Sequence, residues 1–296
     1  MKIGIGLPST NPSVRGQLIL DWARKAEAGP FSSLSVLDRL VYPNYEPLMT
    51  LAAVAAVTQR VRLVTSVLLA PLRNPAMLAK QTASIDALSG GRLTLGLGIG
   101  SREDDFKAAG VLMSQRGRIF EQELALMKRV WSGQPVRDGI GPIGPQVVRQ
   151  GGPEVLIGGY SPEAMQRIGR WGDGYLAGGG SPAQAQQLYQ KAQESWKAAG
   201  RPGKPRFVGC FYFGLGQNAL ERAGTYIKHY YAFLGPMAEG MAQSLPVTPE
   251  AVRQAIESRF QMGMDEVILW PCIPDLDQID RAAEIVNKLT PQAAPT

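Results

Sequence analysis

The sequence has few of the residues that build disulfide frameworks and metal sites, and it lacks the long apolar runs that span membranes. Of its 296 residues only two are cysteines and one is a histidine. Cys210 and Cys272 are far apart in the sequence, so they indicate neither a disulfide framework nor a zinc site, and we expect no metal. The longest apolar runs, such as LAAVAAV, are far too short to span a membrane.

The sequence also lacks a large excess of one charge and a targeting segment. It has 31 basic and 25 acidic side chains, which are interleaved and give a formal net charge of +6. No basic cluster stands out, so we expect a small-molecule substrate as partner and no nucleic acid. The first residues, MKIGIGLPST, contain no apolar signal core, so we expect a cytoplasmic protein with no membrane partner.

What the sequence does contain is a regular alternation of short apolar runs and helical patterns. The predicted strands are KIGIGLP, SSLSVLDR, RVRLVTSVLLAP, RLTLGLGIG, EVLIGG, DGYLAGG, RFVGCFYFGLG and DEVILWP. Helices are predicted over 16–28, from Pro47, from Asn74 and Pro75 to the DALSGG segment, along the stripe from Phe120 to Trp131, and over 162–171, 182–199, about 218–258 and 277–289. Eight strand–helix units predict a single-domain α/β protein, a (β/α)8 TIM barrel over 1–296, with an irregular linker at 132–153. A doubly wound sheet gives the same alternation and is the alternative.

The glycines of LSGGRLTLGLGIGSREDDF, residues 88–106, follow a strand pattern. A dinucleotide fingerprint has the spacing G-x-G-x-x-G and turns directly into a helix, whereas this segment has G-x-G-x-G. Alternation along a strand places Gly96, Gly98 and Gly100 on one face and the leucines on the other. In a barrel that face would point inward near the carboxyl-terminal mouth and leave a flat patch of backbone for a planar ring. Close interior packing is the alternative explanation, and it suits Gly4 and Gly6 of the first strand well.

Several segments together resemble the bacterial luciferase-like monooxygenase superfamily. They are the long segment from YEPLMTLAAVAAV through LSGGRLTLGLGIGSREDDF, then RGRIFEQELALMKRVWSG, VLIGGYSPEAMQRIGRWGDGYL and DEVILWP. The resemblance implies a TIM barrel that binds FMN or the deazaflavin coenzyme F420, of which we favour the deazaflavin. It implies a flavin- or deazaflavin-dependent oxidoreductase that acts by oxygen insertion or hydride transfer. A homodimer and a separate flavin or deazaflavin reductase are expected partners.

The resemblance also points to the residues that would bind the cofactor. It implies a cis peptide between Ser66 and Val67 behind the ring at the barrel mouth. The segment IGGYSPEA ends a strand with paired glycines and opens a helix at Pro162, where free N–H groups and the helix dipole favour phosphate. The segment LAGGGSPAQ repeats this design after the next strand. The candidate cofactor-binding residues are Gly6, Ser66, Val67, Gly98, Gly100, Gly158, Gly159, Tyr160, Ser161, Gly178 and Gly179.

The sequence departs from the family where catalysis is concerned. The family usually has Asp-His after the second strand, but here the pair is Asp38-Arg39, and an arginine cannot shuttle protons. The only histidine, His229, lies on a tyrosine-rich helix, where a structural role is more common. The candidate catalytic residues are Asp38, Arg39 and His229, whereas the run Arg102–Asp105 is expected to be mainly solvated. Tyr226, Tyr230 and Tyr231 suit either a substrate pocket or core packing.

The linker at 132–153 lacks the aromatic and proline pattern that covers the flavin in many relatives. We therefore expect an open site, which weakens the monooxygenase interpretation because a flavin hydroperoxide needs water excluded. A flavin-binding protein that has lost catalysis is the alternative. A nicotinamide dehydrogenase is disfavoured by the glycine spacing.

Overall fold

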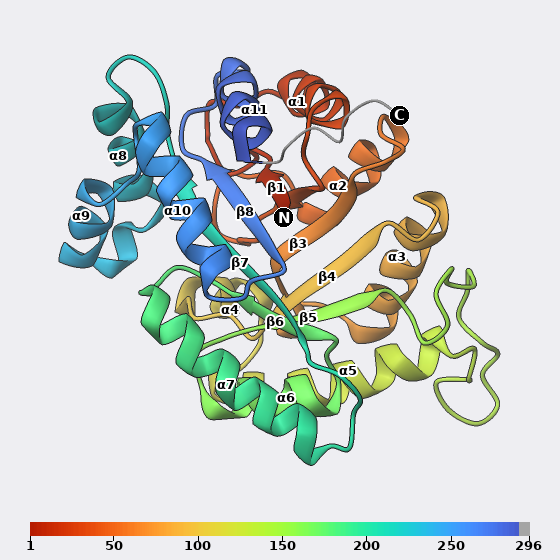
Figure 1. Cartoon of the computed structure of the whole chain (residues 1–296). Helices are drawn as coiled ribbons and strands as arrows, with labels where there is room; N and C mark the ends of the chain where they lie inside the picture. The colour runs from red at the N-terminus through yellow and green to blue at the C-terminus, as the bar shows by residue number, and fades with distance from the viewer. Residues whose placement is uncertain (290–296) are drawn as a thin grey trace, which may run out of the picture.

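The computed structural model describes residues 1–289, and within this range eight parallel strands close into a barrel in sequence order (Figure 1). This confirms the predicted TIM barrel and excludes the open doubly wound sheet. Residues 290–296 of the expected domain lie outside the described range. The strands are β1 (Lys2–Gly6), β2 (Ser33–Val36), β3 (Arg62–Leu69), β4 (Leu93–Gly98), β5 (Glu154–Gly158), β6 (Gly174–Ala177), β7 (Arg206–Phe213) and β8 (Glu266–Pro271).

Helices follow the strands and surround the barrel (Figure 1). The capping signals lie where the sequence predicted them. The side chain of Asn74 accepts hydrogen bonds from the N–H groups of Ala76 and Met77, and Pro75 occupies the first turn of α3. The α-helices are α1 (Gly16–Ala28), α2 (Pro47–Ala56), α3 (Pro75–Leu88), α4 (Glu103–Ala109), α5 (Arg116–Trp131), α6 (Pro162–Arg170), α7 (Pro182–Ala198), α8 (Ala219–Tyr230), α9 (Pro236–Gln243), α10 (Pro249–Gln261) and α11 (Asp277–Leu289), and the 3-10 helices are η1 (Ala70–Leu72), η2 (Met113–Gln115) and η3 (Ala232–Leu234).

The predicted helical region at about 218–258 is three helices, α8, α9 and α10, and not a continuous one. The breaks lie at residues that disfavour a continuing helix. Gly235 has a φ of 56° immediately before Pro236, and Thr248 caps the helix that begins at Pro249. The segment between β7 and β8 is therefore a folded-back excursion beside the barrel, and η3 and α9 follow α8 within it.

The linker at 132–153 lies at the amino-terminal end of the barrel, so the expectation that this linker governs the openness of the site was wrong. It joins α5 to β5, and such connections run to the start of a strand, opposite the mouth. The N–H of Val148 donates to Asp86 near the end of α3, and Arg149 pairs at 2.7 Å with Asp173, which precedes β6. The linker cannot cover a ligand at the mouth.

The interior of the barrel is packed below its mouth. On β4 a Cβ at Gly96 would lie 2.1 Å from the carbonyl oxygen of Thr65 and 2.9 Å from Leu176, so this glycine faces the interior, as predicted. Leu95 and Leu97 are fully buried in the outer core that packs against the helices. The interior side chains form one cluster, which is Val64, Leu156, Leu176, Val208, Ile268 and Trp270. This cluster forms the floor of the mouth. Within residues 1–289 no helix combines the length and apolar character that crossing a membrane requires.

Candidate active site

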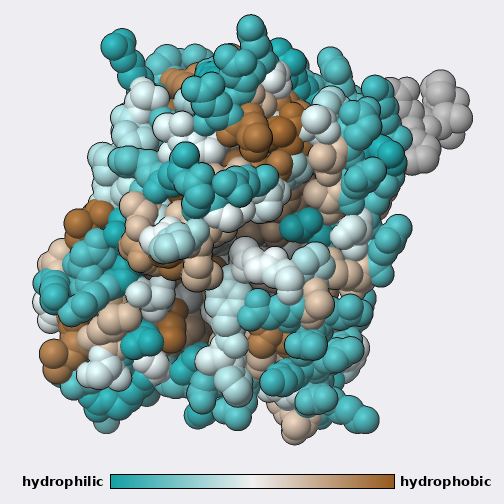
Figure 2. Space-filling model, turned by 90° about the vertical axis from the view of Figure 1, so that its left-hand side faces the viewer, coloured by the Kyte–Doolittle hydropathy of each residue, from teal (hydrophilic) through white to brown (hydrophobic). Residues whose placement is uncertain are grey.

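The carboxyl ends of the strands surround a cavity of about 460 Å³, which we call the mouth cavity. Figure 2 looks onto this end of the molecule and shows a hollow near its centre. Active sites of TIM barrels lie at this end because the loops that follow the strands converge there. The lining residues from strand ends are Leu37, Asp38, Arg39, Ser66, Val67, Leu69, Gly98, Gly100, Gly158, Gly159, Tyr160, Ser161, Leu176, Gly178, Gly179, Cys210, Tyr212 and Trp270.

One wall of the mouth cavity is built around Val67. The peptide bond between Ser66 and Val67 is cis, as the family resemblance implied. A Cβ at Gly98 would lie 2.7 Å from one methyl of Val67, and a Cβ at Gly158 would lie 2.6 Å from the other. The two glycines therefore make room for Val67, and the wall is not the bare backbone patch that the glycine spacing predicted. The hydroxyl of Ser66 is buried and has no hydrogen-bond partner within the described residues.

Two further predicted glycines have different surroundings. Gly100 lines the mouth cavity with a φ of 76°. Gly6 does not line it, because the indole of Trp270 occupies the position that a Cβ at Gly6 would take, at 2.1 Å. Close interior packing, the alternative explanation for this glycine, describes its surroundings.

The glycine-rich segments after β5 and β6 lie side by side at the rim. Ser161 caps α6, because its hydroxyl oxygen accepts from the N–H of Ala164 at 3.3 Å, and the same hydroxyl donates to the carboxylate of Glu163. Tyr160 extends across to the β6 loop and donates to the carbonyl of Gly179 at 2.5 Å. Its hydroxyl also lies 2.6 Å from where a Cβ at Gly178 would be. The two loops thus form one rim, with the amino end of α6 facing the mouth cavity.

The charged lining of the mouth cavity is mainly basic, with four arginines and two aspartates. Arg167 already pairs with Glu121 at 2.8 Å. Arg116 has no ion pair among the described residues, its Nε is buried without a partner, and its Nη1 donates to the carbonyl of Met113. A cation in the first turn of a helix opposes the helix dipole, so the position of Arg116 on α5 indicates an anionic ligand. That position is a signal in the sequence that the glycine motifs do not reveal.

Asp38 lines the mouth cavity but is held by its neighbours. Its two oxygens accept from Arg73 at 2.7 and 3.2 Å, and one of them also accepts from the N–H of Leu69 at 2.8 Å. Burial raises the pKa of Asp38, and the Arg73 charge opposes that shift. This carboxylate therefore fixes the end of β3.

The run Arg102–Asp105 is only partly solvated: Glu103 and Asp104 keep exposed side chains, as predicted, whereas Arg102 and Asp105 turn inward. Asp105 is fully buried and accepts from the N–H groups of Leu40 and Val41 at 3.1 and 2.7 Å. Arg102 lines the mouth cavity, and its guanidinium lies 4.3 Å from the ring centre of Phe233. The short helix α4 turns the run inward, which the charge pattern alone did not reveal.

Arg39 is buried against the same region. Its guanidinium donates to the carbonyls of Tyr230 and Val41 and lies 4.6 Å from the ring centre of Tyr42. Burial lowers the pKa of Arg39 from its ordinary value, although the residue stays a cation near neutral pH. It supplies a fixed positive charge beside the mouth cavity.

Aromatic side chains of β7 and of the excursion after it form the remaining wall. Tyr230, Tyr231 and Phe233 line the mouth cavity together with Tyr212 of β7. The hydroxyls of Tyr212 and Tyr231 lie 2.9 Å apart, and burial raises the pKa of both. Both hydroxyls therefore keep their protons, and since one donates to the other, the second proton can be donated to a ligand.

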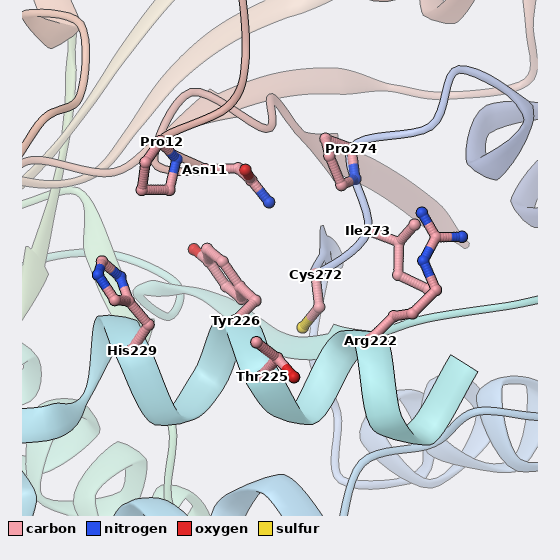
Figure 3. A pocket seen from close by; sticks show the side chains of 9 residues that line it. All are labelled: Asn11, Pro12, Arg222, Thr225, Tyr226, His229, Cys272, Ile273 and Pro274. Atoms are coloured by element: carbon pink, nitrogen blue, oxygen red, sulfur yellow. The ribbon is translucent and has the colours of Figure 1, made fainter. Parts of the chain in front are cut away.

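His229 and Tyr226 face away from the mouth cavity. They line a separate cavity of about 230 Å³, the outer cavity, with residues after β1 and β8. Figure 3 shows both side chains extending from α8 toward Asn11 and Pro12. The Nδ1 atom of His229 is 2.7 Å from the hydroxyl of Tyr42. The structure therefore does not bring His229 together with the other candidate catalytic residues.

Glu123 is a buried carboxyl group of α5 that does not line the mouth cavity. It is 2% exposed on α5, and neither oxygen has a hydrogen-bond partner within the described residues. Burial raises its pKa to about 8, and the charge of Arg73 opposes the shift. The folded state therefore keeps this carboxyl protonated at neutral pH.

Glu123→Gln is expected to stabilise the protein in a pH-dependent way. Because the folded pKa lies above the unfolded value, the carboxyl destabilises the fold increasingly as pH rises from about 4.5 to 8. The gain on substitution should be about 4 kcal/mol at pH 8 and under about 1 kcal/mol at pH 5. Urea unfolding at both pH values measures it, with Glu194→Gln, at an exposed residue of α7, as the control. An equal gain at both pH values would contradict the argument.

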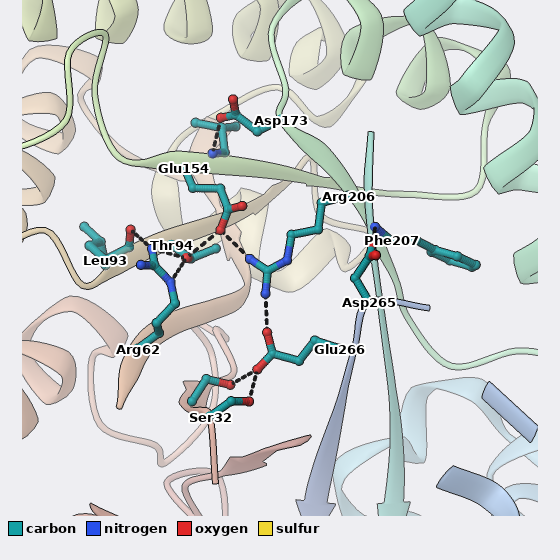
Figure 4. A network of polar contacts seen from close by, with 12 residues as sticks. Ser32, Arg62, Leu93, Thr94, Glu154, Asp173, Arg206, Phe207, Asp265 and Glu266 are labelled. Carbon is teal, nitrogen blue, oxygen red and sulfur yellow. Dashed lines mark hydrogen bonds and ion pairs between the residues drawn. The ribbon is translucent and has the colours of Figure 1, made fainter. Parts of the chain in front are cut away.

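The opposite end of the barrel is closed by a charged network. Figure 4 shows Arg206 at its centre between Glu154 and Glu266. Glu266 is 2% exposed and also accepts from the hydroxyls of Ser32 and Ser33, each at 2.6 Å. In a TIM barrel this end serves stability and not catalysis. The network thus identifies the end of the barrel opposite the mouth as its structural end.

Comparisons with known proteins agree with this geometry. Residues 1–270 match the family model described as luciferase-like monooxygenase. The 5,10-methylenetetrahydromethanopterin reductase of Methanolobus tindarius is 27% identical over 232 residues, which cover 75% of this chain and 68% of the reductase. An uncharacterised protein of Mycobacterium tuberculosis is 29% identical over 211 residues, which cover 60% of this chain and 71% of that protein.

Two solved structures share the fold over nearly the whole chain. A monooxygenase from Streptomyces bottropensis superposes with a TM-score of 0.82 at 23% identity, covering 97% of this chain and 98% of the other. An F420-dependent secondary alcohol dehydrogenase superposes with a TM-score of 0.81 at 18% identity, covering 98% of this chain and all (100%) of the other. At these identities the likeness establishes the barrel alone.

Proposed function

Because the chain belongs to the luciferase-like monooxygenase family, we propose that it is an oxidoreductase that uses a deazaflavin of the coenzyme F420 type to reduce a small organic acceptor. The observation that carries the proposal is the convergence of unpartnered donors in the mouth cavity. Arg116 Nε and the Ser66 hydroxyl have no partner, and Ser161 lies at the amino end of α6. These donors suit a cofactor with a polar ring edge and a phosphate.

The residues present fit such a cofactor. Val67 and the cis peptide would support the ring, and Ser66 would donate to its edge. Arg116 and Ser161 would hold the phosphate. FMN carries the same ring type and a phosphate, so these donors fit either cofactor.

Exposure at the rim supports hydride transfer over oxygen insertion. Tyr160 and Phe233 are 54% and 46% exposed, so the mouth cavity opens to solvent. Oxygen insertion through a flavin adduct requires exclusion of water, whereas hydride transfer is less demanding. The named reductase relative and the F420-dependent alcohol dehydrogenase agree with this choice.

The aromatic wall would act on the substrate. A reduced deazaflavin supplies a hydride to an acceptor when bound. An acceptor oxygen that gains electrons becomes negative, and the free proton of the Tyr212–Tyr231 pair would donate to it. Arg39 would stabilise the same charge, since it remains a cation at neutral pH. Neither role requires the histidine that the sequence lacks after Asp38.

Wild-type protein is expected to bind FMN at least tenfold more tightly than riboflavin, because only FMN offers a phosphate to Arg116 and Ser161. Arg116→Gln should remove most of that preference, since a hydrogen bond to a charged group contributes about 1.5–3 kcal/mol. Tryptophan fluorescence measures the affinities. Arg118→Gln, an exposed arginine of the same helix, is the matched control and should keep the preference.

The same titration with coenzyme F420, followed by anaerobic oxidation of the reduced coenzyme with carbonyl compounds, tests the reaction. Turnover without oxygen supports hydride transfer, and turnover that requires oxygen contradicts it. Equal affinity of wild type for FMN and riboflavin would place the phosphate elsewhere.

A further inference from the structure

A second cavity adjoins the mouth cavity across β7. It has a volume of about 580 Å³, and we call it the side cavity. Gly179, Cys210 and Tyr212 line both cavities, so these residues form the boundary that the two cavities share. The far wall of the side cavity comes from α8, α9, α10 and the segment between α9 and α10.

Arg259 of α10 is the one charged residue that lines the side cavity within the described chain. It has no ion pair among the described residues. Its Nη1 donates to the carbonyl of Ala255 at 2.9 Å, and its guanidinium lies 4.5 Å from the ring centre of Phe211. Burial lowers the pKa of Arg259, so the protein holds a partly desolvated cation without a counter-charge.

Cys210 does not supply a negative counter-charge for Arg259. Burial raises the pKa of Cys210 to about 11, so the thiol is neutral near pH 7 and gives Arg259 no thiolate partner. The lining also includes the apolar side chains of Ile227, Met241 and Leu245. The side cavity thus combines apolar side chains with a cation that has no ion pair among the described residues.

We propose that the side cavity binds the carboxylate end of an arm that extends from a ligand in the mouth cavity, with Arg259 as the anion-binding residue. The guanidinium provides two parallel N–H donors for a carboxylate, and the apolar residues of the lining suit an alkyl or aryl connection. The arm belongs either to the substrate or to the glutamyl tail of coenzyme F420. This inference rests on the proposed function for the ligand in the mouth cavity.

Two pairs of probes distinguish these sources in wild type and Arg259→Gln. Phenylbutanoate and phenylbutanamide differ only in charge, and coenzyme F420 and FMN differ in the glutamyl tail. If the arm belongs to the substrate, Arg259→Gln weakens the binding of phenylbutanoate at least tenfold and leaves the affinity for the amide within twofold of wild type. If the arm belongs to the cofactor, the substitution weakens the binding of F420 at least tenfold and leaves the affinity for FMN within twofold of wild type.

Arg253→Gln is the matched control, because Arg253 lies on the same helix with a 43% exposed side chain and pairs with Glu257 at 2.8 Å. It should leave all four affinities unchanged. The melting temperature of Arg259→Gln should not fall, because no ion pair is lost. Failure of wild type to bind either carboxylate probe, or equal affinities in wild type and Arg259→Gln, would overturn the inference. Failure of wild type to bind any flavin would overturn the proposed function, while the phenylbutanoate titration still decides the role of Arg259.

Discussion

Arg206→Met is expected to lower the free energy of unfolding by about 3–5 kcal/mol, since it leaves a buried carboxylate without its cation. Arg206 joins Glu154 and Glu266 at the closed end of the barrel. Glu266 is 2% exposed, and only serine hydroxyls would remain as its partners. The loss arises mainly from the unpaired charge and not from the deleted bond.

Two further variants separate the effect of the unpaired charge from the effect of the deleted bond. Arg206→Met combined with Glu266→Gln should regain part of the stability, because the uncompensated charge is gone. Arg281→Met, which breaks the exposed pair of Arg281 with Asp277, should cost under about 1 kcal/mol. Urea unfolding measures all three. A loss below 1 kcal/mol for Arg206→Met would show that water or a neighbouring cation compensates Glu266.

The helices and strands that were predicted best from the sequence are those with strong local signals in their residues. The boundaries of α1 and α11 agree with the predicted residues, and α3 begins at the predicted Asn74–Pro75 pair. Apolar runs bounded by turns located all eight strands. The helical region predicted after β7 is helical but divided into separate helices, and Gly235-Pro236 was itself a signal for one of the breaks.

The site was predicted less completely, because it depends on which side chains find partners. Val67 and Gly158 followed from the family resemblance, but sequence could not show that Val67 fills the space above Gly98. Arginines look alike in a sequence, whereas only the fold separates the paired Arg167 from the unpaired Arg116 and Arg259. The linker was misjudged because its position follows from strand direction and not from its composition.

Gly98 gives the strongest test of the ring-binding wall. A Cβ at this position would lie 2.7 Å from a methyl of Val67, and Gly158 confines Val67 from the other side. A leucine at Gly98 must therefore push Val67 into the mouth cavity, where the ring would bind. Gly98→Leu is expected to reduce flavin affinity at least a hundredfold and also to cost stability, typically about 1–3 kcal/mol for overpacking.

Crowding against Val67 is the proposed cause, so shortening Val67 to alanine should rescue the smaller substitution at Gly98. Gly98→Ala should weaken FMN binding at least tenfold, and Gly98→Ala with Val67→Ala should regain stability relative to Gly98→Ala alone. Gly240→Ala is the control, because a Cβ on this helical glycine has nothing within 4 Å. Fluorescence titration and thermal unfolding report the two effects separately. Unchanged FMN affinity in folded Gly98→Leu would mean that the ring does not lie against Val67, because the displaced isopropyl group and the ring cannot occupy the same space.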